Sequence, residues 1–518
     1  MTGKARIIAA LLGGLCGAAV PAWSQQPAIE SLVRQNNQAV YNSVYAFQPA
    51  ITTLWEYDSY AYLMAGYTMS SGDYIQPQEI SNLRLLQIAS ESIWSSPEKG
   101  WVLYGKVNYE NGTSDGGIWN LAYELPANGS PFYYMVGQSG AWKVQRYHFD
   151  VSVAKRLSDR FSLGASILYH GNLYYRTVDS RNTSTNLDLR INPSLAWHLS
   201  GKSTLAVSAI YDRHKNESEI SNKYQHDTDA KQYILYMNQG LGTWEMEPNM
   251  FNQIERLYGG SLSWSRRTKS LSLDLIYRFR TGRESWEHKS YNTDATDGND
   301  PAQYDLTLHE AVARLENYRD SGRWLFLLGG GMTSGEGRVY KLSAATSLDN
   351  YTYSRFETSL RGSWLPVRGL LGRVDAGVVF RSTQQDDSSY GHSIYYADLE
   401  ADLGVDLALI HKPSWSGYCR VGGRYRMNLS ADHTPKAASD NFYTLQIAQP
   451  VLAYLTSDAA AAELQLGSDF RMGRKSRGEV NLKGLLWLPV AYGLYEEAAR
   501  YDLSDCYGSI ALQFVYSF

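Results

Sequence analysis

The sequence is poor in cysteine, in proline and in long apolar runs. It has 3 Cys and 15 Pro in 518 residues, and only Cys419 and Cys506 remain beyond the first 24, too few for a disulfide framework. An excess of one charge is also missing, because 48 Lys and Arg against 52 Asp and Glu leave a net charge of -4. This balance argues against a nucleic-acid partner. Past residue 25 no run approaches the roughly 20 apolar residues of a membrane helix.

Tyrosine, tryptophan and glycine are abundant instead. The chain has 40 Tyr, 14 Trp and 44 Gly, but only 13 Phe. The aromatic excess therefore lies in rings with a polar tip, which suit the boundary between an apolar phase and water.

The N-terminus predicts export. Lys4 and Arg6 precede the apolar run 7–20, and Ala22 and Ser24 place small residues at a cleavage site before Gln25. Residues 1–24 are predicted to be a secretory signal peptide. A membrane anchor is the alternative, but the run is short and interrupted by glycine.

The mature chain alternates between apolar and polar residues with a period of two. In 161–169 the odd positions are Phe, Leu, Ala, Ile and Tyr, whereas three of the four even positions are Ser or Gly. Strands of about 10 residues with one lipid-compatible face are what a transmembrane β-barrel requires, because lipid offers no partner for an open sheet edge. The sequence thus predicts an all-β fold, an antiparallel barrel over 58–518.

About 18 strands are predicted, within a range of 14 to 18. Their segments are 58–69, 83–94, 100–110, 144–156, 160–171, 186–199, 203–213, 257–267, 270–280, 307–319, 323–333, 353–364, 371–382, 394–410, 417–428, 460–472, 478–490 and 507–518. Connections after odd-numbered strands are long (111–143, 214–256 and 281–306 among them), whereas those after even-numbered strands are tight turns. Short periplasmic turns and long extracellular loops are typical of outer-membrane barrels.

The last strand carries a further signal. Phe514, Tyr516 and the terminal Phe518 share its apolar face. They resemble the C-terminal insertion signal that the barrel-assembly machinery recognises in Gram-negative outer-membrane proteins. They are equally explained as the last positions facing lipid.

One predicted hairpin has opposite charges on its two inner faces. Pairing of 394–410 with 417–428 at an index sum of 826 sets acids on the first strand beside arginines on the second. These pairs are Asp406 with Arg420, Asp402 with Arg424, and Glu400 with Arg426, and Asp398 continues the acidic face. Such charges are expected to face the lumen, because a basic residue on the lipid side costs about 2–4 kcal/mol near the midplane.

Two interpretations of this hairpin stay open. It can be an ion-paired wall that sets a field across a solute pathway, or a ladder of cross-strand pairs that only fixes register. A second hairpin carries more arginine than acid, which favours anionic solutes. Its inner residues are Arg355, Glu357, Arg361, Arg373, Asp375 and Arg381.

Catalytic motifs are incomplete. His309 and Glu310 lack the second His of a zinc helix, and the stretch 137–141 lacks the last Gly of a nucleophile elbow. The ten His include no pair at ligand spacing. We therefore expect no catalytic residue, no metal and no cofactor. An outer-membrane hydrolase built across adjacent strands is the less favoured alternative.

Two segments outside the strands are apolar enough to fold inward. Residues 25–57 have loosely helical apolar spacing and predict a periplasmic segment or lumen plug, with a flexible lead-in as the alternative. Residues 442–456 lie in the long connection 429–459, where Pro450 is expected to break any strand.

Over most of its mature length the chain resembles outer-membrane barrel families of unknown function from Bacteroidota. The residues that carry the resemblance are Ala65-Gly66-Tyr67-Thr68, the stretch 72–79, the tyrosine-rich strands and Phe518. The resemblance implies a Gram-negative outer-membrane location and, often, a neighbouring TonB-dependent transporter with a surface lipoprotein, hence nutrient or iron uptake.

Two function classes follow. The first is a channel or accessory component for solute uptake, since 18 strands can enclose an aqueous path. The second is a non-conducting surface or assembly component whose loops bind a lipoprotein or a transporter.

Overall fold

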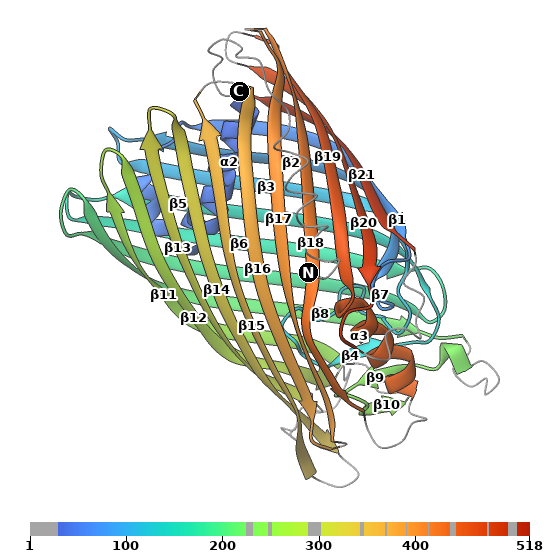
Figure 1. Cartoon of the computed structure of the whole chain (residues 1–518). Helices are drawn as coiled ribbons and strands as arrows, with labels where there is room; N and C mark the ends of the chain where they lie inside the picture. Colours follow the sequence, from blue (N-terminus) through green and yellow to red (C-terminus); the bar gives the residue numbers. More distant parts are fainter. Residues whose placement is uncertain are drawn as a thin grey trace.

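Eighteen strands form one closed antiparallel wall in the computed structural model (Figure 1). The described residues are 30–223, 231–246, 251–288, 302–341, 346–367, 370–389, 391–412, 414–435, 442–473, 476–495 and 505–518. Each strand pairs with the next in chain order, and the wall closes where β21 pairs with β1, with Tyr62 opposite Ser517. The predicted fold class is confirmed. The predicted signal peptide lies outside the described residues.

The strand bounds are as follows. The barrel strands are β1 (Tyr60–Gly72), β2 (Ile80–Ser96), β3 (Trp101–Gly116), β5 (Gly140–Arg156), β6 (Phe161–Arg176), β7 (Arg181–His198), β8 (Ser203–Ser221), β11 (Phe251–Arg267), β12 (Leu271–His288), β13 (Ala302–Arg319), β14 (Gly322–Lys341), β15 (Thr346–Pro366), β16 (Leu371–Asp387), β17 (His392–Lys412), β18 (Trp415–Thr434), β19 (Asp458–Arg471), β20 (Arg477–Ala491) and β21 (Tyr507–Ser517). Among the described residues, no helix is long and apolar enough to cross a membrane.

Each predicted segment overlaps one strand, but most strands run further toward the long loops than predicted. The connections predicted at 214–256 and 281–306 are shorter, because β8 ends at Ser221 and β12 at His288. Beyond the predicted ends of β12 and β13, outward side chains include charged pairs, such as Arg283 with Asp305 at 2.6 Å. Because the strands were predicted from an apolar face that suits lipid, each predicted segment ends where the outward face of the strand becomes polar.

The two faces of the wall differ in polarity. On β21 the outward side chains Ile510, Leu512 and Phe514 are 61%, 52% and 45% exposed, whereas the inward Val515 is buried. Most large exposed apolar side chains of the chain have such outward positions. The exterior is therefore the lipid-facing surface, and polar side chains are gathered inside.

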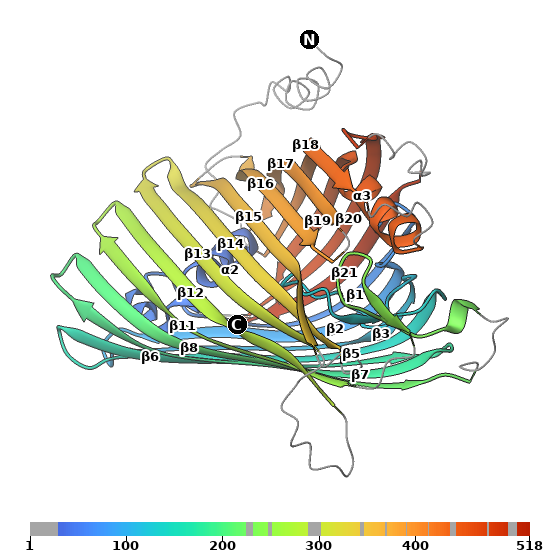
Figure 2. The same cartoon turned by 90° about the horizontal axis from the view of Figure 1, so that it is seen from below.

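The N-terminal segment lies inside the barrel near the tight turns. It consists of α2 (Glu30–Ser43) and two short helical turns, η1 (Tyr45–Phe47) and η2 (Pro49–Leu54). We call residues 30–54 the N-terminal plug. Its apolar side chains pack on inward residues from strands all around the wall: Ile93, Val102, Tyr104, Ala154, Ala196, Ala206, Ile276 and Leu325. Figure 2 shows α2 enclosed by the strands.

Gly164 permits the closest approach of the N-terminal plug to the wall. A Cβ at Gly164 on β6 would lie 2.4 Å from the backbone nitrogen of Ala50. That nitrogen donates to the hydroxyl of Ser194 at 2.7 Å. Only glycine leaves room for the backbone of η2 here.

We expect Gly164→Ala to loosen the N-terminal plug. A shift of about 1.4 kcal/mol toward an undocked state would raise its population tenfold, and with it the rate of tryptic cleavage at Arg34. Limited digestion followed by mass spectrometry measures this rate. Gly331→Ala is the matched control, since its Cβ would lie 3.7 Å from the nearest atom, His309 O. Equal cleavage of the two variants would contradict the expectation.

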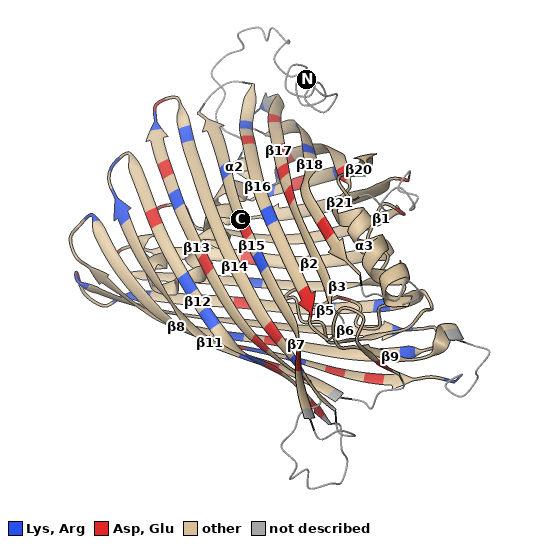
Figure 3. Ribbon diagram, turned by 60° about the horizontal axis from the view of Figure 1, so that its bottom comes forward, with Lys and Arg blue, Asp and Glu red and all other residues tan. Residues whose placement is uncertain are grey.

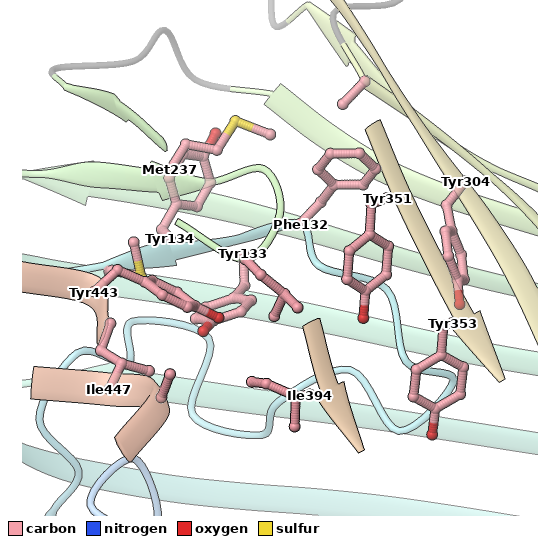
Figure 4. Close-up of a cluster of buried hydrophobic side chains, with 14 of the residues drawn as sticks. Phe132, Tyr133, Tyr134, Met237, Tyr304, Tyr351, Tyr353, Ile394, Tyr443 and Ile447 are labelled. Atoms are coloured by element: carbon pink, nitrogen blue, oxygen red, sulfur yellow. The ribbon is translucent and has the colours of Figure 1, made fainter. Parts of the chain in front are cut away.

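A second body of inward-folded chain lies toward the long loops. It contains β4 (Tyr133–Met135), η3 (Lys231–Tyr233), β9 (Tyr236–Asn238), β10 (Trp244–Met246), the π-helical η5 (Thr444–Ala448) and α3 (Gln449–Leu455). We call it the loop core. Figure 4 shows Phe132, Tyr134, Met237 and Tyr443 gathered with the wall residue Tyr351. The barrel is thus occupied from both ends.

Candidate functional site: the charged wall of the lumen

Charged side chains line the inner faces of β15 to β20, between the N-terminal plug and the loop core. The register places Asp406 opposite Arg420, Asp402 opposite Arg424, and Glu400 opposite Arg426, as the index sum predicted. Figure 3 shows acidic and basic positions, in red and blue, on the neighbouring ribbons of β15 to β18.

Register neighbours are not always ion partners. Arg420 and Asp406 pair at 2.8 Å. Asp402 instead pairs with Arg361 at 3.4 Å, two strands away. Long arginine side chains reach past the directly opposite residue, so diagonal pairs compete with the predicted ones.

Glu400 and Arg426, the third predicted pair, also have other partners. Glu400 pairs with Arg381 at 3.2 Å. Arg426 instead donates to the Tyr74 hydroxyl at 2.8 Å and to the Tyr454 carbonyl at 2.9 Å. Arg426 therefore ties the wall to the loop core instead of completing the predicted pair.

Residues of the two predicted clusters pair with each other across β16, β17 and β18. Asp406 is fully buried and lies 2.8 Å from both Arg373 and Arg420. Asp375 contacts the same two arginines at 3.1 and 2.8 Å. Arg373 and Asp375, assigned to the second hairpin by the sequence, thus belong with the first.

Arg381 is the centre of a second group of pairs. Its guanidinium lies 3.2 Å from Asp398, 3.2 Å from Glu400 and 3.6 Å from Glu357. Glu357 in turn pairs with Arg355 at 2.7 Å.

Glycines on the inner face give the charges room to lie flat. A Cβ at Gly404 would lie 2.4 Å from Arg420 Nη2, and one at Gly377 would lie 2.4 Å from Asp402 Oδ1. Glycine at these two positions leaves room for the observed placement of the Arg420 and Asp402 side chains.

Sequence reasoning missed Glu463 on β19 and Lys483 on β20. Glu463 lies 3.3 Å from Lys483 and 3.8 Å from Arg424. The inner face of 459–469 is otherwise small or uncharged until Asp469, so no partner pattern revealed Glu463. We use the term charged wall for Arg355, Glu357, Arg361, Arg373, Asp375, Arg381, Asp398, Glu400, Asp402, Asp406, Arg420, Arg424, Glu463 and Lys483.

Three cations of the charged wall are more exposed than the acids they pair with. The side chains of Arg361, Arg424 and Lys483 are 57%, 40% and 46% exposed, whereas Asp402 and Glu463 are 17% and 11% exposed. In these pairs the cation is the group presented to the lumen.

A further network, on the opposite wall, was also missed. Asp212 pairs with Arg190 at 2.6 Å and with Arg280 at 2.5 Å, and Glu310 links Arg280 to Arg278. The Arg278 guanidinium lies 4.1 Å from the ring centre of Phe47 in the N-terminal plug, a cation–π contact. The charged residues come from four strands, β7, β8, β12 and β13, which no short sequence pattern brings together.

The predicted insertion signal lies on the outer face of β21. Phe514 and Phe518 are 45% and 66% exposed, and the rings of Tyr516 and Phe518 lie 5.8 Å apart. Within the described part of the chain, no three His, Cys, Asp or Glu side chains are arranged to hold a metal ion.

Comparisons with known proteins give a family and several similar structures. A family model described as "Family of unknown function (DUF6850)" matches residues 49–509. The search of curated proteins gave no significant match.

Three solved structures resemble the chain. The monoaromatic hydrocarbon channel CymD is 12% identical, with 90% of this chain and 92% of that one covered and a TM-score of 0.28. The toluene transporter TbuX of Ralstonia pickettii is 13% identical, with 91% of each chain covered and a TM-score of 0.29. The copper transporter OprC is 9% identical, with 88% and 80% covered and a TM-score of 0.39. All three TM-scores are below 0.5.

Proposed function

We propose that this chain, which belongs to the family of unknown function DUF6850, is a gated barrel for uptake of small polar solutes across the Gram-negative outer membrane. The observation that carries the proposal is the exposure of Arg361, Arg424 and Lys483 inside the barrel. A lumen filled by side chains would bury these cations, and burying charges without full pairing is costly. Their exposure supports a solvent-filled space between the two inner bodies.

Gating is proposed because both ends of this space are occupied. The N-terminal plug closes the side of the tight turns, and the loop core closes the other. The exposed cationic groups of Arg361, Arg424 and Lys483 support a preference for anions. Nutrient or iron uptake would be consistent with this arrangement.

The second candidate is a non-conducting component that binds a surface lipoprotein or a TonB-dependent transporter. Outward ion pairs favour it, since Arg283 with Asp305 and Arg338 with Asp349 form a charged rim on β12 to β15. Such a rim stands clear of lipid and offers a polar surface to a partner. Absence of current at any voltage, from the full chain and from a chain without the N-terminal plug, would favour this candidate.

We expect Arg424→Glu to reverse the ion preference of the lumen. The substitution places a third carboxylate beside Asp402 and Glu463, so the local surface becomes negative and the current changes from anion-preferring to cation-preferring. The reversal potential in a KCl gradient across a planar bilayer measures this, in a protein whose N-terminal plug has been removed.

Arg283→Glu is the control for that experiment. It makes the same charge change on the outer rim, where it is expected to leave the reversal potential unchanged. If Arg424→Glu also leaves it unchanged in an open pore, the charged wall is a structural ladder.

A further inference from the structure

A cavity of about 280 Å³ lies between the loop 122–134 and the inner faces of β7, β8, β11 and β12. It is separate from the charged wall. Glu124 and Ala127 lie exposed at its edge, while Phe132 and Trp286 on its lining are buried. The cavity belongs to the loop core, part of which is drawn in Figure 4.

Three amide side chains face this cavity with unused donors. The Asn186 carbonyl oxygen accepts from Ser184, and that of Asn216 accepts from Ser184 and Ser218. Among the described residues, the NH2 groups of both have no hydrogen-bond partner, nor has Gln253. Asn186 and Gln253 are only 7% and 9% exposed. Buried amides are normally hydrogen-bonded, so these donors suit a bound molecule.

Acceptors line the same cavity. Asp188 pairs with His214 at 2.5 Å. Glu255 accepts from Asn128 of the covering loop at 2.6 Å, and Glu284, behind the cavity, accepts from Ser130 at 2.8 Å. Donors and acceptors are therefore interspersed around one small volume.

Charge narrows the class of ligand. The acids Asp188, Glu255 and Glu124 disfavour an anion, while His214 is the basic side chain on the lining. Because no three His, Cys, Asp or Glu side chains of the described residues are arranged to hold a metal ion, a simple cation is disfavoured as well. A neutral molecule whose groups both donate and accept hydrogen bonds fits the amide donors and the carboxylate acceptors of the lining.

Aromatic rings complete the lining. Trp286 meets Tyr134 edge to face with the ring centres 5.5 Å apart, and its Nε1 donates to Glu284 at 2.8 Å. The indole is thus held in one orientation. Phe132, Tyr134 and Trp286 are at most 3% exposed, so these rings form the rigid base of the cavity, and the amides and carboxylates around it are the groups that can bond the hydroxyls of a sugar ring.

We propose that this cavity binds a neutral saccharide of one or two rings. Its volume lies at the small end of ligand sites. The inference goes beyond the proposed uptake function, because occupancy does not require that the barrel conducts.

The test is titration calorimetry on the full chain in detergent, with tryptophan fluorescence as a second readout. The probes are glucose, galactose, N-acetylglucosamine, maltose and cellobiose. We expect at least one to bind, and we expect Asn186→Ala with Gln253→Ala to weaken it by about tenfold or more, since two hydrogen bonds are lost. Galacturonate is expected to bind more weakly than galactose.

Asn172→Ala is the matched control, since this lumen amide on β6 bonds His148 at 3.1 Å outside the cavity. It is expected to keep wild-type affinity. If the double variant fails to fold, as judged by its heat-modifiable band in electrophoresis, Asn216→Asp replaces it. The proposal is overturned if none of the five probes binds, if binding survives loss of the amides, or if galacturonate binds more tightly.

Discussion

A chain lacking residues 30–54 is expected to conduct about tenfold more current than the full chain, or more, because an 18-stranded barrel is wide enough for an aqueous path once its interior is vacated. The N-terminal plug contacts strands around the whole wall. Its polar contacts, such as the ion pair of Arg34 with Glu479, hold it there. Single-channel recording in planar bilayers measures the change.

Two point variants test the same idea without shortening the chain. Gly164→Ala is expected to give intermittent openings, and Gly331→Ala is expected to behave as the parent. Unchanged conductance after removal of the N-terminal plug would show that the loop core alone closes the lumen.

Arg314→Met is expected to lower the free energy of unfolding by about 3–5 kcal/mol, the usual cost of breaking a buried ion pair from one side. Arg314 is 1% exposed and lies 2.7 Å from Asp274 and 3.2 Å from Glu316, both fully buried. Without the guanidinium, Asp274 keeps Arg267 and the Ser265 hydroxyl as partners, and Glu316 keeps Arg323 and the Tyr57 hydroxyl, so each carboxylate loses one of its two arginines. Urea titration followed by tryptophan fluorescence gives the value.

Arg283→Met is the control for this experiment. Its pair with Asp305 is 48% exposed on both sides, so the expected loss is at most about 1 kcal/mol. A double variant that adds Asp274→Asn is expected to recover part of the loss at Arg314, because it removes one of the stranded charges. Equal losses at Arg314 and Arg283 would contradict the interpretation.

The strands and the register of the hairpin β17–β18 were predictable from sequence. The alternation of apolar and polar residues is a local signal. The predicted index sum of 826 holds over 398–408, where the three predicted pairs lie, and becomes 827 beyond the bulges at Ala397/Asp398 and Ala408/Ile410. The ion partners were not predictable, because Asp402 reaches Arg361 across two strands and Arg426 turns to Tyr454. The ion partner of each charged residue depends on the length of the side chains and on the room left by glycines such as Gly377, beside which Asp402 lies.

The interior bodies were less visible in the sequence. Residues 25–57 and 442–456 are apolar enough to fold inward, but the spacing of their apolar residues does not indicate which strands they pack against. The cavity under 122–134 gave no signal, since its amides come from β7, β8 and β11 and meet only after the barrel closes.

The connection between the N-terminal plug and the wall sets the mechanics of opening. Leu54 ends η2 and Tyr60 begins β1, and five extended residues span at most about 18 Å. A displaced N-terminal plug therefore stays within this distance of the start of β1. Because the connection is short, rebinding of the plug to the wall is an intramolecular step at high effective concentration. The closed state is therefore restored quickly after each opening.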